Sequence, residues 1–106
     1  MTLPELDPAQ REAALAKATE ARRVRADAKQ RLKSGQLSLP QFLDAADGSA
    51  PLAKMRVSDV LESMPAYGPV KAERLMGRLE IAPSRRVRGL GSRQRAALVA
   101  AFAPRP

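Results

Sequence analysis

The chain has 106 residues, the size of a single domain with at most a flexible arm. Its 19 lysines and arginines against 11 aspartates and glutamates give a formal charge of +8, which favours a polyanionic partner: nucleic acid first, then an anionic membrane surface or an acidic protein. The absence of histidine and cysteine excludes Ser-His-Asp and Cys-His catalysis, thiolate metal sites and disulfides.

Membrane insertion and secretion are also disfavoured. No apolar run approaches the roughly 20 residues that a membrane-spanning helix needs. The opening MTLPELDP lacks the basic start and apolar core of a signal peptide. We therefore expect a cytoplasmic protein that does not bind membranes, with no cofactor and no metal.

Residues 7–35 predict a long helix. Asp7 suits the capping position, Pro8 the first helical position and Gln10 the partner position of a capping box. Gly35 suits the end of the helix. Because its apolar stripe consists mostly of alanines, which bury little area, we expect this helix to pack loosely and to project from the rest of the protein.

The other faces of this helix are rich in Lys and Arg, and two interpretations stay open. One is a solvated face with i,i+4 ion pairs, such as Asp27 with Arg31. The other is a second surface that contacts phosphate. Its candidate residues are Arg22, Arg23, Lys29 and Lys33.

Apolar spacing predicts further helices at 38–48, 51–65, 69–81 and from about Ser92 onward. Ser58 is the expected cap where the second of these kinks, and Val70 is expected to face inward. No segment alternates like a strand, so the predicted fold class is all-α.

The corner 65-PAYGPVK-71 offers a site for an anion. Gly68 lets a phosphate approach the backbone, and the unpaired N–H groups of the following helix point out of the loop. Lys71 adds a full positive charge beside the positive end of the helix dipole. The alternative is an ordinary turn between two packed helices.

A second basic corner follows at 84-SRRVRGLG-91. The two glycines that flank Leu90 indicate a shaped loop, with Leu90 in the core and the arginines presented outward. Guanidinium groups bind phosphates in a forked geometry and also enter narrow minor grooves. A simple solubility feature is the alternative.

The run from Met64 to Ala72 resembles the helix-hairpin-helix loop of sequence-independent DNA-binding proteins, with Ala66 where glycine is usual. The longer segment LESMPAYGPVKAERLMGRLEIAPSRRVRGLGSRQRAAL resembles the helix-two-turn-helix module shared by a ribosomal small-subunit protein and the formamidopyrimidine-type DNA glycosylases. With the basic N-terminal helix added, the chain most closely resembles the actinobacterial integration host factor family, through segments 7–33, 54–72 and 80–95.

This resemblance implies a long basic N-terminal helix, residues 1–35, and a compact helix-two-turn-helix bundle, residues 36–106, in one folded unit. It implies a monomeric nucleoid protein that binds double-stranded DNA with little sequence preference, bends or compacts it, and assists a site-specific recombinase acting on the same DNA. The implied first-turn residues are Pro65, Ala66, Tyr67, Gly68, Val70 and Lys71. The implied residues of the second region, the lid, are Ser84, Arg85, Arg86, Arg88 and Arg93.

Two questions stay open at this point. Tyr67 either contacts DNA or only braces the turn. The competing function is RNA binding or ribosome association, because the ribosomal relative shares the two-turn module. An enzyme is not expected, since the chain has neither room for the catalytic domain of the glycosylases nor cysteines for their zinc finger.

Overall fold

The computed structural model describes residues 7–103, so the prediction made from the opening residues lies outside it. The helices in chain order are α1 (Pro8–Ser34), α2 (Leu39–Asp47), α3 (Ala50–Ala53), α4 (Val57–Glu62), α5 (Pro69–Arg78), the short 3₁₀ helix η1 (Val87–Gly89) and α6 (Ser92–Ala101). Within the described range the only β-type pairing is one isolated antiparallel bridge between Arg56 and Arg86. The all-α prediction is confirmed.

Helix α1 begins and ends where its sequence indicates. The Asp7 carboxylate accepts a 2.7 Å hydrogen bond from the Gln10 N–H, and the Gln10 side chain accepts one of 3.1 Å from the Asp7 N–H. Gly35 closes the helix with φ at 80°, a left-handed conformation that glycine adopts without strain.

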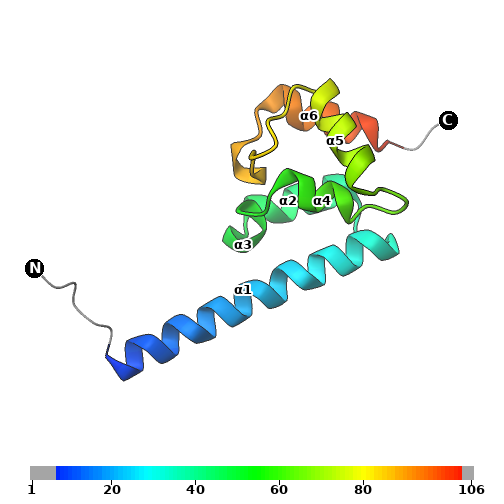
Figure 1. Cartoon of the computed structure of the whole chain (residues 1–106). Coiled ribbons are helices and arrows are strands. Elements are labelled where there is room, and N and C mark those ends of the chain that lie inside the picture. Colours follow the sequence, from blue (N-terminus) through cyan, green and yellow to red (C-terminus); the bar gives the residue numbers. More distant parts are fainter. Residues whose placement is uncertain (1–6, 104–106) are drawn as a thin grey trace, which may run out of the picture.

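Only the C-terminal part of α1 belongs to the core. Residues 8–20 are all exposed, whereas Ala28 and Leu32 are buried. This part packs against α2 and α3, and the rest of the helix extends beyond the body (Figure 1). The molecule is accordingly elongated, with extents of 57 × 31 × 24 Å. The expected projecting helix is observed.

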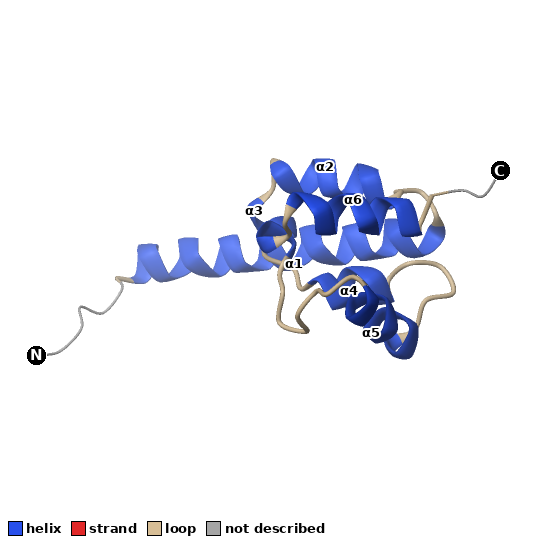
Figure 2. Ribbon diagram, turned by 90° about the horizontal axis from the view of Figure 1, so that it is seen from above, coloured by secondary structure: helices blue, strands red, loops and turns tan. Residues whose placement is uncertain are grey.

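The body places its helices on two sides of the α1 axis. Seen from above, α2 and α6 lie on one side and α4 and α5 on the other (Figure 2). The core between them is aliphatic except for the fully buried Phe42. Among the described residues, no helix is long and apolar enough to cross a membrane.

The segment 51–65 forms two short helices, so the single kinked helix was a wrong prediction. The break lies at Lys54–Arg56, and α4 begins after Arg56 without a side-chain cap, so Ser58 is not a cap. The reason is tertiary. The Met55 carbonyl accepts from the Val87 N–H at 2.9 Å, and the Val57 N–H donates to the Arg85 carbonyl at 3.0 Å. Pairing with the lid therefore replaces helical hydrogen bonds.

The expectation that Val70 faces inward is also wrong, because its side chain is 60% exposed. Helix α5 buries Ala72, Leu75 and Met76. Val70 lies two residues from Ala72, about 200° around a helix with 3.6 residues per turn, and so on the opposite face.

Candidate nucleic-acid interface

The first turn joins α4 to α5 and leaves the start of α5 uncapped. Ala66 adopts φ of 62°, the left-handed conformation that the usual glycine would take without strain. Gly68 is the N-cap and Pro69 the first helical residue, and no side chain caps the helix. The N–H groups of Val70 and Lys71 therefore have no intrahelical acceptor and are free to bind an anion.

Tyr67 braces this turn from inside. Its half-buried ring lies 4.8 Å from the ring of Phe102, which follows the end of α6. The Lys71 ammonium lies 5.7 Å from the centre of the Tyr67 ring and donates a 3.4 Å hydrogen bond to the Ala66 carbonyl. The tyrosine thus connects the turn to α6 and lies beside the lysine, and these contacts fit a bracing role.

A basic groove continues from the turn along α5. It has a volume of about 470 Å³ and is lined by Tyr67, Lys71, Arg74, Gly77 and Arg78. Arg74 and Arg78 were not among the predicted site residues. Their spacing from Lys71, three and seven residues on one helix, would have identified them. We call Tyr67, Gly68, Lys71, Arg74 and Arg78 the first-turn surface.

Two of the lid arginines hold the lid in place. The Arg86 guanidinium donates to the Lys54 carbonyl at 2.6 Å, and the Arg85 guanidinium donates to the Gly89 carbonyl at 2.9 Å. A Cβ at Gly89 would approach the Arg85 side chain to 3.2 Å, so this contact favours glycine. Arg85 and Arg86 therefore shape the loop as well as charging it.

The remaining lid candidates are open to solvent. Ser84, Arg88 and Arg93 are exposed and make no side-chain hydrogen bond or ion pair with the described part of the chain. Arg93 lies in the first turn of α6. Gly91 is the N-cap of this helix, and its N–H donates to the Gln94 side chain at 2.9 Å.

The lid adjoins α1 in a second basic groove of about 360 Å³. Its charged lining is Arg25, Lys29, Lys54, Arg56, Asp59 and Arg86. Sequence reasoning missed Lys54 and Arg56, because only the tertiary bridge between the α3–α4 linker and the lid brings them to this place. We call Arg25, Lys29, Lys54, Arg56, Arg86 and Arg88 the lid surface.

The α1 candidates divide between two faces. Arg22, Lys29 and Lys33 share a face by helical spacing, and the missed Arg25 belongs to it. Arg23 points elsewhere and pairs with Glu20, whose oxygens accept at 2.6 and 3.0 Å. The hydrogen bond from Arg23 lowers the pKa of the Glu20 carboxyl, but the pair is exposed and contributes little stability.

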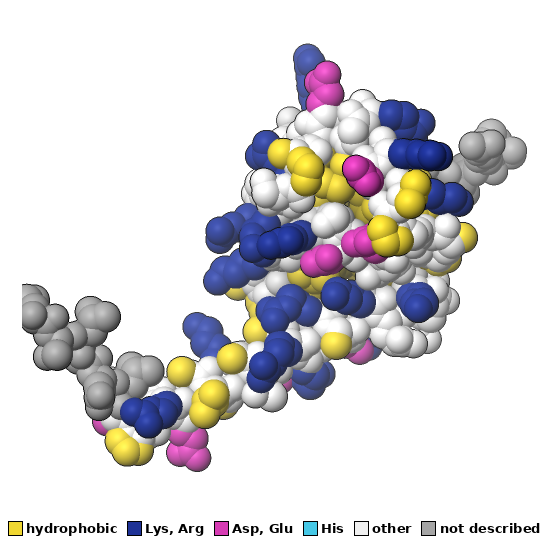
Figure 3. All heavy atoms as spheres, in the orientation of Figure 1, with side chains coloured by type: hydrophobic (Ala, Val, Ile, Leu, Met, Phe, Trp, Pro, Cys, Tyr) yellow, Lys and Arg dark blue, Asp and Glu magenta, His cyan; other side chains and the backbone are white. Residues whose placement is uncertain are grey.

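The two basic surfaces lie at opposite ends of the body. In Figure 1 the loop between α4 and α5 is at one end and the lid around η1 at the other. The space-filling view shows Lys and Arg gathered over the lid end and along α1 (Figure 3). The structure thus groups the lid with α1 and separates it from the first turn.

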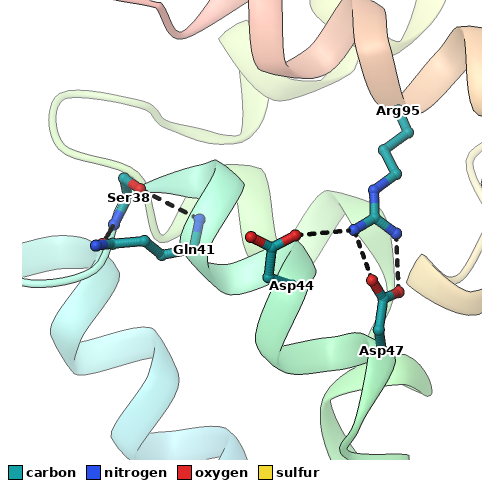
Figure 4. A network of polar contacts seen from close by, with 5 residues as sticks. All are labelled: Ser38, Gln41, Asp44, Asp47 and Arg95. Carbon is teal, nitrogen blue, oxygen red and sulfur yellow. Dashed lines mark hydrogen bonds and ion pairs between the residues drawn. The ribbon is translucent and has the colours of Figure 1, made fainter.

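A polar contact fixes α6 relative to α2. The Arg95 guanidinium donates two hydrogen bonds of 2.9 Å to the two oxygens of Asp47 and lies 3.5 Å from Asp44 (Figure 4). The hydrogen bond from Arg95 lowers the pKa of the Asp47 carboxyl. This contact uses the acidic face of α2 and keeps Arg95 out of the basic surfaces. No cluster of acidic residues suited to a metal occurs within 7–103.

The fold and the comparisons identify the class of protein. The chain matches the family described as S13-like H2TH domain over residues 32–102, so it contains a helix-two-turn-helix domain extended by α1. A solved structure described as sIHF bound to an 8 bp palindromic DNA superimposes with a TM-score of 0.80 at 46% identity, covering 83% of this chain and 99% of that one.

Relatives that match nearly the whole chain identify the family within this class of protein. The integration host factor of Mycobacterium tuberculosis is 54% identical over 102 residues, which is 96% of this chain and 97% of the relative. That of Streptomyces coelicolor is 50% identical over 102 residues, covering 96% and 95%. The chain belongs to the actinobacterial integration host factor family.

Proposed function

We propose that this protein is a nucleoid-associated protein that binds double-stranded DNA with little sequence preference, as a monomer, through phosphate contacts. On this proposal it bends or compacts DNA and thereby assists site-specific recombination on the same DNA. The sIHF structure, solved with DNA, supports duplex DNA as the ligand.

The observation that carries the proposal is the pair of basic surfaces, each built around fixed backbone. At the first turn, the start of α5 has no side-chain cap and Lys71 lies beside it, a combination that suits a phosphate group. At the lid, the pinned loop presents Arg86 beside Arg25 and Lys29 of α1, and Arg88 lines an adjoining groove with Arg86. Contacts of this kind position a protein on the duplex without reading its bases.

RNA is the competing ligand, because the matched family is described as S13-like. The discriminating experiment is competition of labelled duplex DNA with unlabelled duplex DNA, duplex RNA and structured RNA of equal length. The proposal requires duplex DNA to be the strongest competitor. A preference for either RNA would replace it with RNA binding or ribosome association.

The phosphate mechanism predicts a steep salt dependence. With on the order of four to six phosphate contacts, the logarithm of the binding constant falls against the logarithm of salt concentration with a slope of about −4 to −5. Fluorescence anisotropy over a salt series gives this slope. A slope near zero excludes the electrostatic mechanism.

Single-residue variants locate the contacts. Lys71→Ala and Arg88→Ala each remove one phosphate contact, so each should lower the magnitude of the slope by about 1 on every DNA sequence. The matched control is Arg31→Ala, which removes the same charge from a residue that pairs with Asp27 at 3.1 Å on another face of α1. If the control weakens binding as much as the two variants do, the charge acts globally and the site is misplaced.

A further inference from the structure

A third surface groove differs from the two basic ones in chemistry. It lies between α4 and α5, has a volume of about 390 Å³, and is floored by Ala72, Met76 and Ile81. Pro69 and Pro83 form its apolar walls. None of the candidate DNA-binding residues of the two basic surfaces lines this groove.

The polar rim of this groove is acidic. Glu62 of α4 and Glu73 of α5 line it, and neither carboxylate makes a hydrogen bond or ion pair within the described residues. In Figure 3 hydrophobic and acidic side chains meet on the face over α4 and α5, away from the basic lid end. On a chain with a net charge of +8, two unpaired carboxylates beside an apolar floor form a local reversal of charge.

Val70 extends the apolar surface beside the groove. It is one of two large hydrophobic side chains that are strongly exposed among residues 7–103, the other being Leu15 on the projecting part of α1. By helical spacing Val70 shares a stripe with Glu73 and Gly77, both of which line the groove. The burial of Ala72, Leu75 and Met76 already anchors α5, so packing within the chain does not explain an exposed valine at this position.

We propose that this groove is a docking site for a protein segment that presents an apolar side chain flanked by Lys or Arg. The apolar side chain would occupy the floor over Ala72 and Met76, and the flanking cations would pair with Glu62 and Glu73. The negative charge of the rim repels DNA and favours a basic segment. The positively charged remainder of the surface repels such a segment. The groove adjoins the basic groove along α5, since Gly77 lines both, and this proposal does not depend on which ligand the basic surfaces bind.

Peptide probes test the proposal on the full chain without DNA. A fluorescent helical peptide of about 14 residues, roughly four turns, carries Leu at i,i+4 spacing flanked by Arg. One comparison peptide replaces each Arg with Gln, and another replaces each Leu with Ser. We expect the Leu/Arg peptide to bind most tightly, with methyl chemical-shift changes confined to Ala72, Met76, Ile81 and Val70.

Variants of the rim supply the decisive comparison. Glu62→Gln with Glu73→Gln should weaken the Leu/Arg peptide about fivefold and leave the Leu/Gln peptide unchanged, since two exposed ion pairs are lost. Glu12→Gln with Glu20→Gln makes the same net charge change on the exposed part of α1 and should have no effect. The proposal is overturned if the Leu/Arg peptide does not bind, binds no better than the Leu/Gln peptide, or binds the rim variant unchanged. Binding of duplex DNA by the rim variant is measured in a separate experiment. A negative result with the peptides therefore does not bear on the proposal that the protein binds DNA.

Discussion

At the scale of single residues, the first turn contains a measurable strain. Ala66 adopts φ of 62°, where an alanine costs about 1–2 kcal/mol more than in its ordinary conformations. Glycine relieves this cost but loses about 0.5–1 kcal/mol through the greater freedom of its unfolded chain. Ala66→Gly should therefore raise the free energy of unfolding by about 0.5–1 kcal/mol, measured by urea titration.

The opposite exchange at Gly35 is the matched control. Its φ of 80° is also left-handed, and an added Cβ would meet nothing within 4 Å, so only the backbone resists the change. Gly35→Ala should lower the free energy of unfolding by about 1 kcal/mol. If the free energy of unfolding changes in the same direction in both variants, the left-handed backbone conformation does not control stability at these positions.

The role of a residue was predictable from the sequence where its contacts are to neighbours along the chain. The capping box of Asp7 and Gln10 and the stop at Gly35 follow from three-residue spacings that helix ends require. Roles that depend on distant contacts were not predictable. The contact of Tyr67 with Phe102 joins the turn to a residue 35 positions later, and the hydrogen bond from Arg86 to the Lys54 carbonyl joins the lid to a residue 32 positions earlier.

At the scale of elements, the attachment of α6 to α2 should make stability depend on pH. The Arg95 guanidinium holds the pKa of the Asp47 carboxyl below its usual value of about 3.9. The contribution of this pair is therefore fully present above that value and is lost as pH falls through the lower pKa of the folded protein.

Comparison with Asp47→Asn isolates this effect. Thermal unfolding from pH 7 to pH 2 should show wild type more stable than the variant at neutral pH, with the two melting temperatures converging below about pH 3.9. Because the Asp47 side chain is 62% exposed and the Arg95 side chain 35% exposed, solvent screens the pair and we expect the difference to be small. A constant offset at all pH values would mean that the carboxylate contributes through packing alone.

The position of a helix was predictable where its own apolar spacing and capping residues mark it in the sequence. The long helix, the short helix capped by Ser38 and the start of α6 near Ser92 were found this way. The break at Lys54–Arg56 was not, because local propensity continues a helix there. Backbone bonds to residues some thirty positions later override it: Met55 to Val87 and Val57 to Arg85.

At the scale of the whole molecule, the candidate residues fall on two separate surfaces. In the sequence the first turn and the lid lie only about twenty residues apart. The fold instead sends the chain along α5 and back, so the two corners lie at opposite ends, and the lid joins α1 (Figure 1). The two basic corners were visible in the local sequence, whereas the way the fold groups them with Lys54, Arg56 and Arg25 depends on the path of the chain.

This separation predicts that one monomer contacts two duplex segments. Triple variants test it: Lys71→Ala, Arg74→Ala and Arg78→Ala at one end, and Arg25→Ala, Arg56→Ala and Arg88→Ala at the other. Each should keep part of the affinity and lose about three units of the salt slope, because the other surface remains. Each should also lose the ability to bring two tethered duplexes together or to draw the ends of a long duplex closer, as measured by energy transfer.

The mass of the complex decides between bridging by one molecule and by two. Sedimentation of the wild type with short duplexes should give one protein with two duplexes, because the first turn and the lid lie at opposite ends of the body. One duplex per protein, with binding abolished by one triple variant and unaffected by the other, would leave a single DNA surface. In that case bending would have to come from one end of the molecule alone.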